Sequence, residues 1–151
     1  MNELQKLLDS EGVRYFRAQE LTLQRQWGTH AEPPADYLPR ILPTVILADE
    51  IREKLGAPIR VSSGYRTLEY NRHVGGSPSS EHMQFRALDL QPHDPGLMEG
   101  MRGIATAVVA RARARGWNVA LIHYDRFIHI DVGSERRKNL DLDLDLDSRR
   151  P

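Results

Sequence analysis

Polar residues inside two apolar strand patterns constrain this chain more than any other feature. His82 lies seven residues before Asp89, which stands between two leucines, and about forty residues later His129 stands between two isoleucines. A polar side chain buried in an apolar strand is costly unless a partner satisfies it. Two imidazoles and one carboxylate are a common ligand set for a catalytic zinc ion. If the fold brings these three side chains together, the sequence predicts a metal site.

The same residues also have a structural interpretation. Along its strand His129 shares a face with Asp131, because strand side chains alternate, so the two can simply form a hydrogen bond. Asp89 can cap a turn, and His123 on the preceding strand is a rival ligand. Both interpretations stay open on the residues alone.

The composition excludes several classes of function. A chain of 151 residues is expected to form one domain with its own core. Lys plus Arg and Asp plus Glu both total 21, and this neutral balance argues against a nucleic-acid or membrane-surface binder. The chain has no cysteine, so any metal must be held by histidines and carboxylates.

The N-terminal residues do not resemble a Sec-type signal peptide. The first ten residues include acidic side chains and lack the apolar core of a signal peptide, and no apolar run approaches a membrane span. We therefore expect a protein that is cytoplasmic when made. Residues 1–133 are expected to form a single domain. Residues 134–151, with Leu-Asp repeats between basic residues, are expected to form a disordered tail.

Apolar spacing predicts an α+β domain. Helices are expected over residues 4–11, 37–55, 67–73 and 97–115. Strands are expected over residues 58–63, 87–90, 119–124 and 127–132, the last two forming a hairpin. Residues 13–22 are expected to be extended, with a short element beginning at Glu20-Leu21. Pro43 either kinks the second helix or marks its true start. Helices and strands do not alternate strictly, which favours a small, mostly antiparallel sheet with flanking helices.

Several segments together resemble the M15 peptidases, the zinc D-Ala-D-Ala carboxypeptidases and the related bacteriophage endolysins. The resemblance spans Phe16 to Gly133 and rests on an ordered set of motifs. These are Ser63-Gly64-Tyr65-Arg66, Asn71-Arg72 with Val74-Gly75-Gly76, Ser80 with His82 and Asp89, and His129-Ile130-Asp131. The ordered set is far more specific than any of its parts.

The resemblance implies a fold similar to the hedgehog signalling domain and the D-Ala-D-Ala peptidases. It implies one zinc ion held by His82, Asp89 and His129, and cleavage of bacterial cell-wall peptides. Arg66 matches the arginine that binds or polarises the substrate near its carboxylate, although an arginine at this place can also form a surface ion pair with Glu69. Ser80 matches a serine near the substrate.

Two positions depart from the family pattern. The glycine often found three residues after the first ligand is Phe85 here. The acidic residue expected three positions before the last histidine ligand is Arg126, and Asp125 lies one residue away from that position. Asp131 follows the last ligand by two residues, as in a subgroup of the family. Both aspartates are candidates for the general base, with Asp125 slightly preferred because a hairpin tip can reach over the site.

The sequence thus predicts a zinc peptidase, of the carboxypeptidase or endopeptidase type, that acts on peptidoglycan peptides. We expect a monomer, made in the cytoplasm and released to the cell wall as a phage lysin, without nucleic-acid partners or membrane insertion. Arg126 favours an alternative, in which the fold keeps its zinc ion but only binds cell-wall peptide or serves as a structural phage or envelope component.

Overall fold

The computed structural model describes residues 2–133. The helices in this range are α1 (Asn2–Ser10), α2 (Ala18–Thr22), the 3₁₀ helix η1 (Ala35–Ile41), α3 (Leu42–Leu55), α4 (Leu68–His73), the 3₁₀ helix η2 (Pro95–Leu97) and α5 (Met98–Ala114). The strands are β1 (Leu23–Gln24), β2 (Thr29–His30), β3 (Ile59–Ser63), β4 (Ala87–Pro92), β5 (Val119–His123) and β6 (Ile128–Val132). Within the described range no helix is both long and apolar enough to cross a membrane.

A four-stranded antiparallel sheet forms the centre of the molecule, with the strand order β3-β4-β6-β5. Its register pairs Asp89 on β4 with His129 on β6, and His129 with Ile122 on β5. The hairpin predicted from the alternating residues near the C-terminus is therefore present. The prediction of an α+β domain with a small antiparallel sheet and flanking helices is confirmed.

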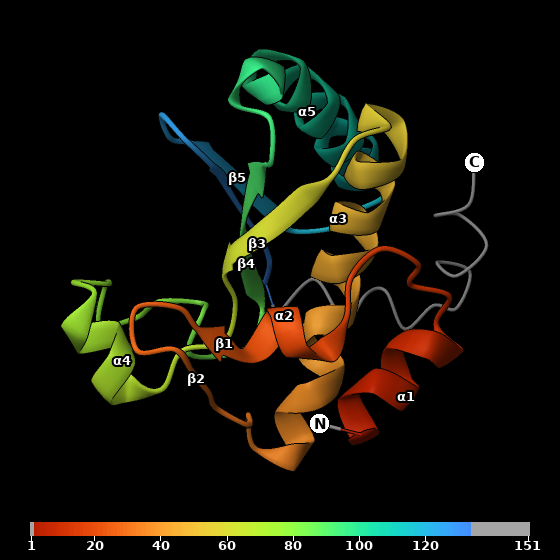
Figure 1. The fold of residues 1–151 in the computed structure, drawn as a ribbon. Coiled ribbons are helices and arrows are strands. Elements are labelled where there is room, and N and C mark those ends of the chain that lie inside the picture. The colour runs from red at the N-terminus through yellow and green to blue at the C-terminus, as the bar shows by residue number, and fades with distance from the viewer. Residues whose placement is uncertain (1, 134–151) are drawn as a thin grey trace.

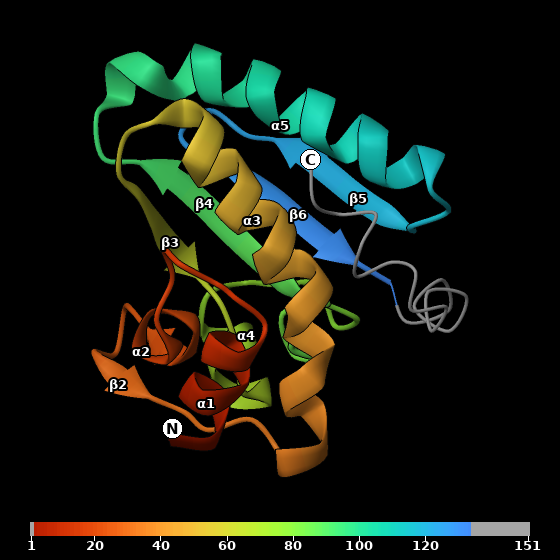
Figure 2. The same cartoon turned by 90° about the vertical axis from the view of Figure 1, so that its right-hand side faces the viewer.

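Helices α3 and α5 lie across one face of this sheet (Figure 2). The strand residues that point to them are fully buried: Leu88 and Leu90 on β4, and Ile128 and Ile130 on β6. Because side chains alternate along a strand, Asp89 and His129 point to the opposite face. On that side of the sheet, α4 lies beside the β1–β2 segment (Figure 1). Helices α3 and α5 thus cover one face of the sheet, and the polar residues Asp89 and His129 lie on the opposite face.

The long helix expected over residues 37–55 is divided in two. Residues Ala35–Ile41 form η1, and α3 starts at Leu42 with Pro43 in its first turn. A proline is tolerated there because the N–H it lacks would have no helical partner. Pro43 therefore marks the start of the helix, and Gly56 ends it in a left-handed conformation, with φ of 68°.

The expected extended segment over residues 13–22 is wrong in its second half, because Ala18–Thr22 forms α2. The Glu20 side chain accepts a hydrogen bond from the Arg17 backbone N–H at 2.8 Å, which fixes the first turn. Leu21 is fully buried, so tertiary packing holds a helix too short to be visible as a periodic pattern. The tail predicted over residues 134–151 lies outside the described residues.

Candidate metal centre

The three predicted ligands meet on the face of the sheet opposite α3 and α5. His82 lies in the turn that precedes β4, Asp89 lies on β4 and His129 lies on β6. The His82 Nε2 atom is 3.2 Å from Asp89 Oδ1, and the His129 Nδ1 atom is 3.0 Å from the same oxygen. Each residue can offer one ligand atom within 4.8 Å of the other two.

The outer nitrogen of each imidazole is already bound. The His82 Nδ1–H donates to the Gly64 carbonyl oxygen at 2.8 Å, and the His129 Nε2–H donates to Asp131 Oδ2 at 2.7 Å. Backbone carbonyls and carboxylates in this outer position fix the ring orientation of metal-ligating histidines. When both rings are neutral, their inner nitrogens direct lone pairs at Asp89.

This donor set fits a cation. Two lone-pair nitrogens and a carboxylate oxygen facing one another repel unless a positive charge lies between them. A tetrahedral zinc site with bonds of about 2.0–2.1 Å places its ligand atoms about 3.3 Å apart. The measured separations from Asp89 Oδ1, 3.0 and 3.2 Å, are close to that spacing. Imidazole and carboxylate ligands also suit zinc by their chemistry.

Without a metal, protons would supply the missing positive charge. Burial lowers the pKa of His129, but its hydrogen bonds to Asp131 and Asp89 outweigh burial and raise the pKa to about 9. Burial would also raise the pKa of Asp89, yet hydrogen bonds from His129 and His82 hold it well below its usual range. At neutral pH a metal ion therefore has to displace a proton from His129.

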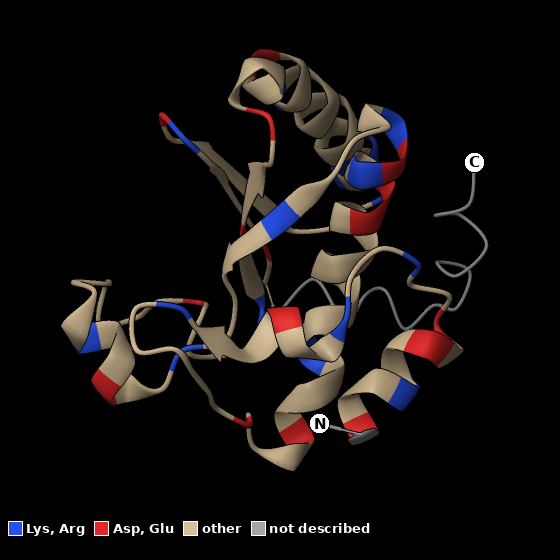
Figure 3. Ribbon diagram, in the orientation of Figure 1, with Lys and Arg blue, Asp and Glu red and all other residues tan. Residues whose placement is uncertain are grey.

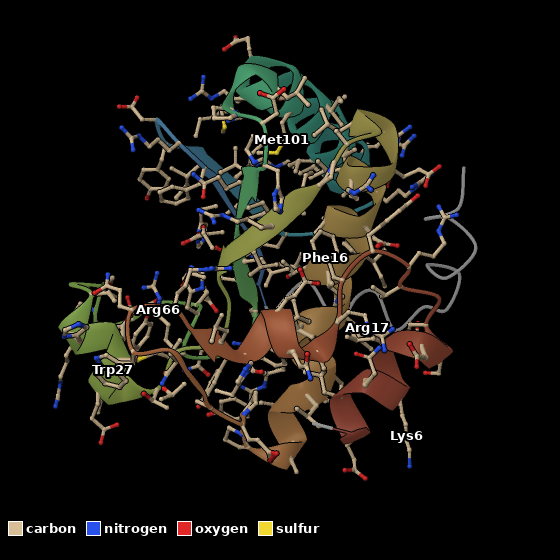
Figure 4. The ribbon with its side chains drawn as sticks, in the orientation of Figure 1. Lys6, Phe16, Arg17, Trp27, Arg66 and Met101 are labelled. Carbon is tan, nitrogen blue, oxygen red and sulfur yellow. The ribbon has the colours of Figure 1, made fainter. Side chains whose placement is uncertain are left out.

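Arg66 supports the cluster from the β3 side, where the α4 segment meets the sheet (Figure 4). Its Nη2 atom is 3.6 Å from Asp89 Oδ2, its Nε–H donates to Ser63 Oγ at 3.0 Å, and its Nη1–H donates to Asn71 Oδ1 at 3.1 Å. The structure thus brings Arg66 to the predicted ligands. The alternative expectation of a surface ion pair does not describe it, because its side chain is only 14% exposed.

Asn71 is a part of the site to which the sequence assigned no role. It is 1% exposed, and while its Oδ1 binds Arg66, its Nδ2–H donates to the Ser77 carbonyl at 2.9 Å. A Cβ atom at Gly76 would lie 2.1 Å from Asn71 Oδ1. Asn71 and Gly76 both belong to the quoted motifs, but only their packing reveals that together they hold the arginine.

Ser80, predicted to lie near the substrate, contacts the chain of the first ligand. Its hydroxyl accepts a hydrogen bond from the His82 backbone N–H at 3.1 Å. The His82 carbonyl in turn accepts from the Arg66 N–H at 3.2 Å. Ser80 therefore fixes the turn that carries His82.

The two candidate bases lie in different surroundings. Asp131 is in the cluster through His129, and its side chain is 14% exposed. Asp125 is exposed at the hairpin tip, where its backbone carbonyl accepts from Arg102 at 3.1 Å. It borders a pocket of about 370 Å³ at the end of the sheet, beside Met98 on α5.

The rival ligand His123 points away from the cluster. Its Nε2 atom lies 3.4 Å from Thr106 Oγ1 on α5, which is the helix side of the sheet. Strand alternation explains the difference, because His129 pairs with Ile122, the neighbour of His123.

One of the comparisons with known proteins identifies the family of the chain. A family model described as Peptidase M15 matches residues 14–131, which is most of the chain and includes every residue of the cluster. The searches of curated proteins and of solved structures found no match. The chain therefore belongs to the peptidase M15 family, a family of metal-dependent peptidases, and His82, Asp89 and His129 form a group that can bind a metal ion.

Proposed function

We propose that the protein is a zinc-dependent peptidase that hydrolyses amide bonds in bacterial cell-wall peptides, as a carboxypeptidase or endopeptidase. The observation that carries the proposal is that His82, Asp89 and His129 bring three ligand atoms together. The outer nitrogens of the two histidines bond to the Gly64 carbonyl and to Asp131, and these bonds orient both rings. A cluster that served only as a hydrogen-bond network would need no such orientation of its lone pairs.

The chain's own residues divide the work of hydrolysis. When bound, a zinc ion polarises the substrate carbonyl and makes a nearby water more acidic. Asp131 keeps His129 in the tautomer whose Nδ1 faces Asp89, and Arg66 balances the charge of that carboxylate. The water oxygen bonds to the carbonyl carbon, the C–N bond breaks, and a carboxylate carries the water's proton to the leaving amine.

We assign this proton transfer to Asp131. A general base must lie within hydrogen-bond reach of the proton it takes, directly or through one water. Asp131 bonds the outer nitrogen of His129, on the far side of that ring from Asp89, so it would take the proton through one water. Asp125 lies in the bend between β5 and β6, where its backbone carbonyl accepts a hydrogen bond from Arg102 on α5, the helix side of the sheet. The preference for Asp125 that the sequence suggested is therefore reversed in this proposal.

Turnover of purified peptidoglycan by zinc-loaded protein tests the assignment. We expect Asp131→Asn to lower kcat by about 100-fold or more, the range of a general acid–base group, and Asp125→Asn to change kcat less than about threefold. Release of free amino groups measures the rate. Loss of turnover in Asp125→Asn with retention in Asp131→Asn would reverse the assignment.

A second candidate function is supported by Arg126, which stands where the resemblance to the M15 peptidases implies an acidic residue. In this alternative the protein holds zinc and binds cell-wall peptide, or is structural, without cutting it. The same assay separates the two, because a zinc-loaded parent protein that binds peptidoglycan but releases no amino groups would be a binding or structural protein.

A further inference from the structure

The metal cluster lies between two flanks of different chemistry. Strand alternation and register place Arg60 on β3 and Gln91 on β4 on the same face as Asp89, and Ile122 on β5 on the same face as His129. The ligands come from the two central strands, so one flank is the β3 side and the other is the β5 side.

The β3 flank carries the positive charges of Arg25 and Arg60. Arg60 is exposed, and both its Nε–H and its Nη2–H donate to the neutral Gln91 side chain, at 3.0 and 2.7 Å. Arg25 is anchored at the outer edge of β3 by a bond from its Nη2–H to the Val61 carbonyl, at 3.2 Å. Figure 3 shows basic residues on β3 and on the β1–β2 segment.

Neither Arg25 nor Arg60 forms an ion pair with any residue of the described range 2–133. Arg66, the third arginine of this flank, already shares its charge with Asp89. The hydrogen bonds hold the guanidinium of Arg60 in a fixed place but leave its charge unmatched. A ligand carboxylate would match that charge with a charge-assisted hydrogen bond.

The β5 flank is an apolar ledge made of Ile122, Tyr124 and Phe127. Ile122 and Tyr124 are each 44% exposed, and they are two of the four large apolar side chains that the described residues expose. The Tyr124 ring stacks on Phe127, with centroids 4.6 Å apart. Ile122 pairs directly with His129, so the ledge begins one strand spacing, about 4.8 Å, from a ligand. Exposed apolar side chains next to a polar cluster are typical of a binding surface.

The span between the flanks suits a short peptide. From β3 to β5 there are three strand spacings, about 14 Å, and an extended peptide covers that distance in about four residues at ~3.3–3.6 Å each. A peptide that crosses the strands would place its middle bond over Asp89 and His129. Its two ends would then meet the arginines on one side and the apolar ledge on the other.

We propose that the site takes a short peptide that carries a carboxylate on the β3 side of the cleaved bond and an uncharged apolar residue on the β5 side. This deepens the proposed function and rests on it, since it assumes that the cluster is where a peptide is cut. Arg60 and Ile122 are then specificity-determining residues for the two sides.

Binding to the metal-free protein tests the proposal without relying on catalysis. The probes are stem peptides released from purified peptidoglycan, and the same peptides with their carboxyl groups converted to methylamides. Calorimetry gives Kd for the parent, Arg60→Gln and Ile122→Thr. The matched controls are Arg115→Gln, an exposed arginine just beyond the C-terminal end of α5, and His123→Thr, the next residue on β5, which faces the helices.

The parent should bind the native peptides about 10-fold more tightly than the methylamides, and Arg60→Gln should lose most of this discrimination. Ile122→Thr should bind both probes about 5-fold more weakly, because an apolar contact is lost, and both controls should match the parent. Equal binding of the two probes by the parent, no binding of either, or unchanged discrimination in Arg60→Gln would overturn the proposal.

The failure of this inference and the failure of the proposed function give different results. If the zinc-loaded parent hydrolyses peptidoglycan while Arg60→Gln and Ile122→Thr bind as the parent does, the flanks do not select the substrate. If the probes bind as expected but zinc-loaded protein cuts nothing, the flanks are supported as a binding surface and hydrolysis is not.

Discussion

At the scale of single residues, Phe85 explains a departure from the family pattern. Its φ of 56° makes it the one non-glycine residue in the described range with a positive φ, and it is fully buried. The turn after His82 therefore needs the left-handed conformation that a glycine adopts without strain, and for other residues that conformation costs about 1–2 kcal/mol. The buried ring, edge-on to Tyr65 with centroids 5.9 Å apart, offsets this cost.

Two substitutions separate the strain from the packing. Phe85→Ala keeps the strained backbone and loses the ring, so we expect it to destabilise the fold by about 3–5 kcal/mol. Phe85→Gly loses the ring but relieves the strain, so it should be about 1 kcal/mol more stable than Phe85→Ala. Urea unfolding of the metal-free proteins measures both values. Equal stability of the two variants would show that the backbone stores no strain here.

At the scale of elements, the segment from α4 to β4 fixes the position of the Arg66 side chain. A Cβ atom at Gly76 would lie 2.1 Å from Asn71 Oδ1 and 2.7 Å from Arg66 Nη1, the two atoms that join the loop to the arginine. The backbone just after β3 packs equally closely against α2, because a Cβ at Gly64 would lie 2.2 Å from the Leu21 carbonyl oxygen. Neither contact leaves room for a side chain.

Gly76→Ala should therefore displace Arg66 without removing a metal ligand. We expect kcat/KM on peptidoglycan peptides to fall by about 10-fold or more, as when a charge-assisted contact is lost, while the zinc content is unchanged. Gly100→Ala on α5 is the control, because its Cβ meets no atom within 4 Å. A parent-like kcat/KM for Gly76→Ala would mean that the position of Arg66 does not matter to the reaction.

Sequence patterns predicted these elements unevenly. The strands with buried leucines and isoleucines, β4 and β6, were found because their polar residues stood out against apolar neighbours. Helix α2 was missed because five residues are too few for a period, and its burial against other elements decides its shape. The start of α3 at Leu42 follows from Pro43, which cannot donate a helical hydrogen bond. From the sequence alone, Pro43 allowed two interpretations, a kink in a long helix or the start of a shorter one.

At the scale of the whole molecule, the pairing register of β4 and β6 brings the residues of the metal cluster together. Asp89 and His129 lie 40 residues apart in the chain and face each other only because β4 pairs antiparallel with β6. The residue pattern and the family resemblance predicted the three ligands. They did not predict which nitrogen of each histidine faces inward, the role of Asn71, or the two flanks, since each depends on distances between elements that the sequence does not contain.

The most direct test of the account is the zinc content of the protein purified without chelator, measured by elemental analysis after zinc has been offered. The parent and His93→Ala, a histidine exposed in a loop, should each hold about one zinc ion per chain, and His82→Ala should hold almost none. A parent protein without zinc, or a His82→Ala variant with as much zinc as the parent, would contradict the assignment of His82, Asp89 and His129 as a metal site.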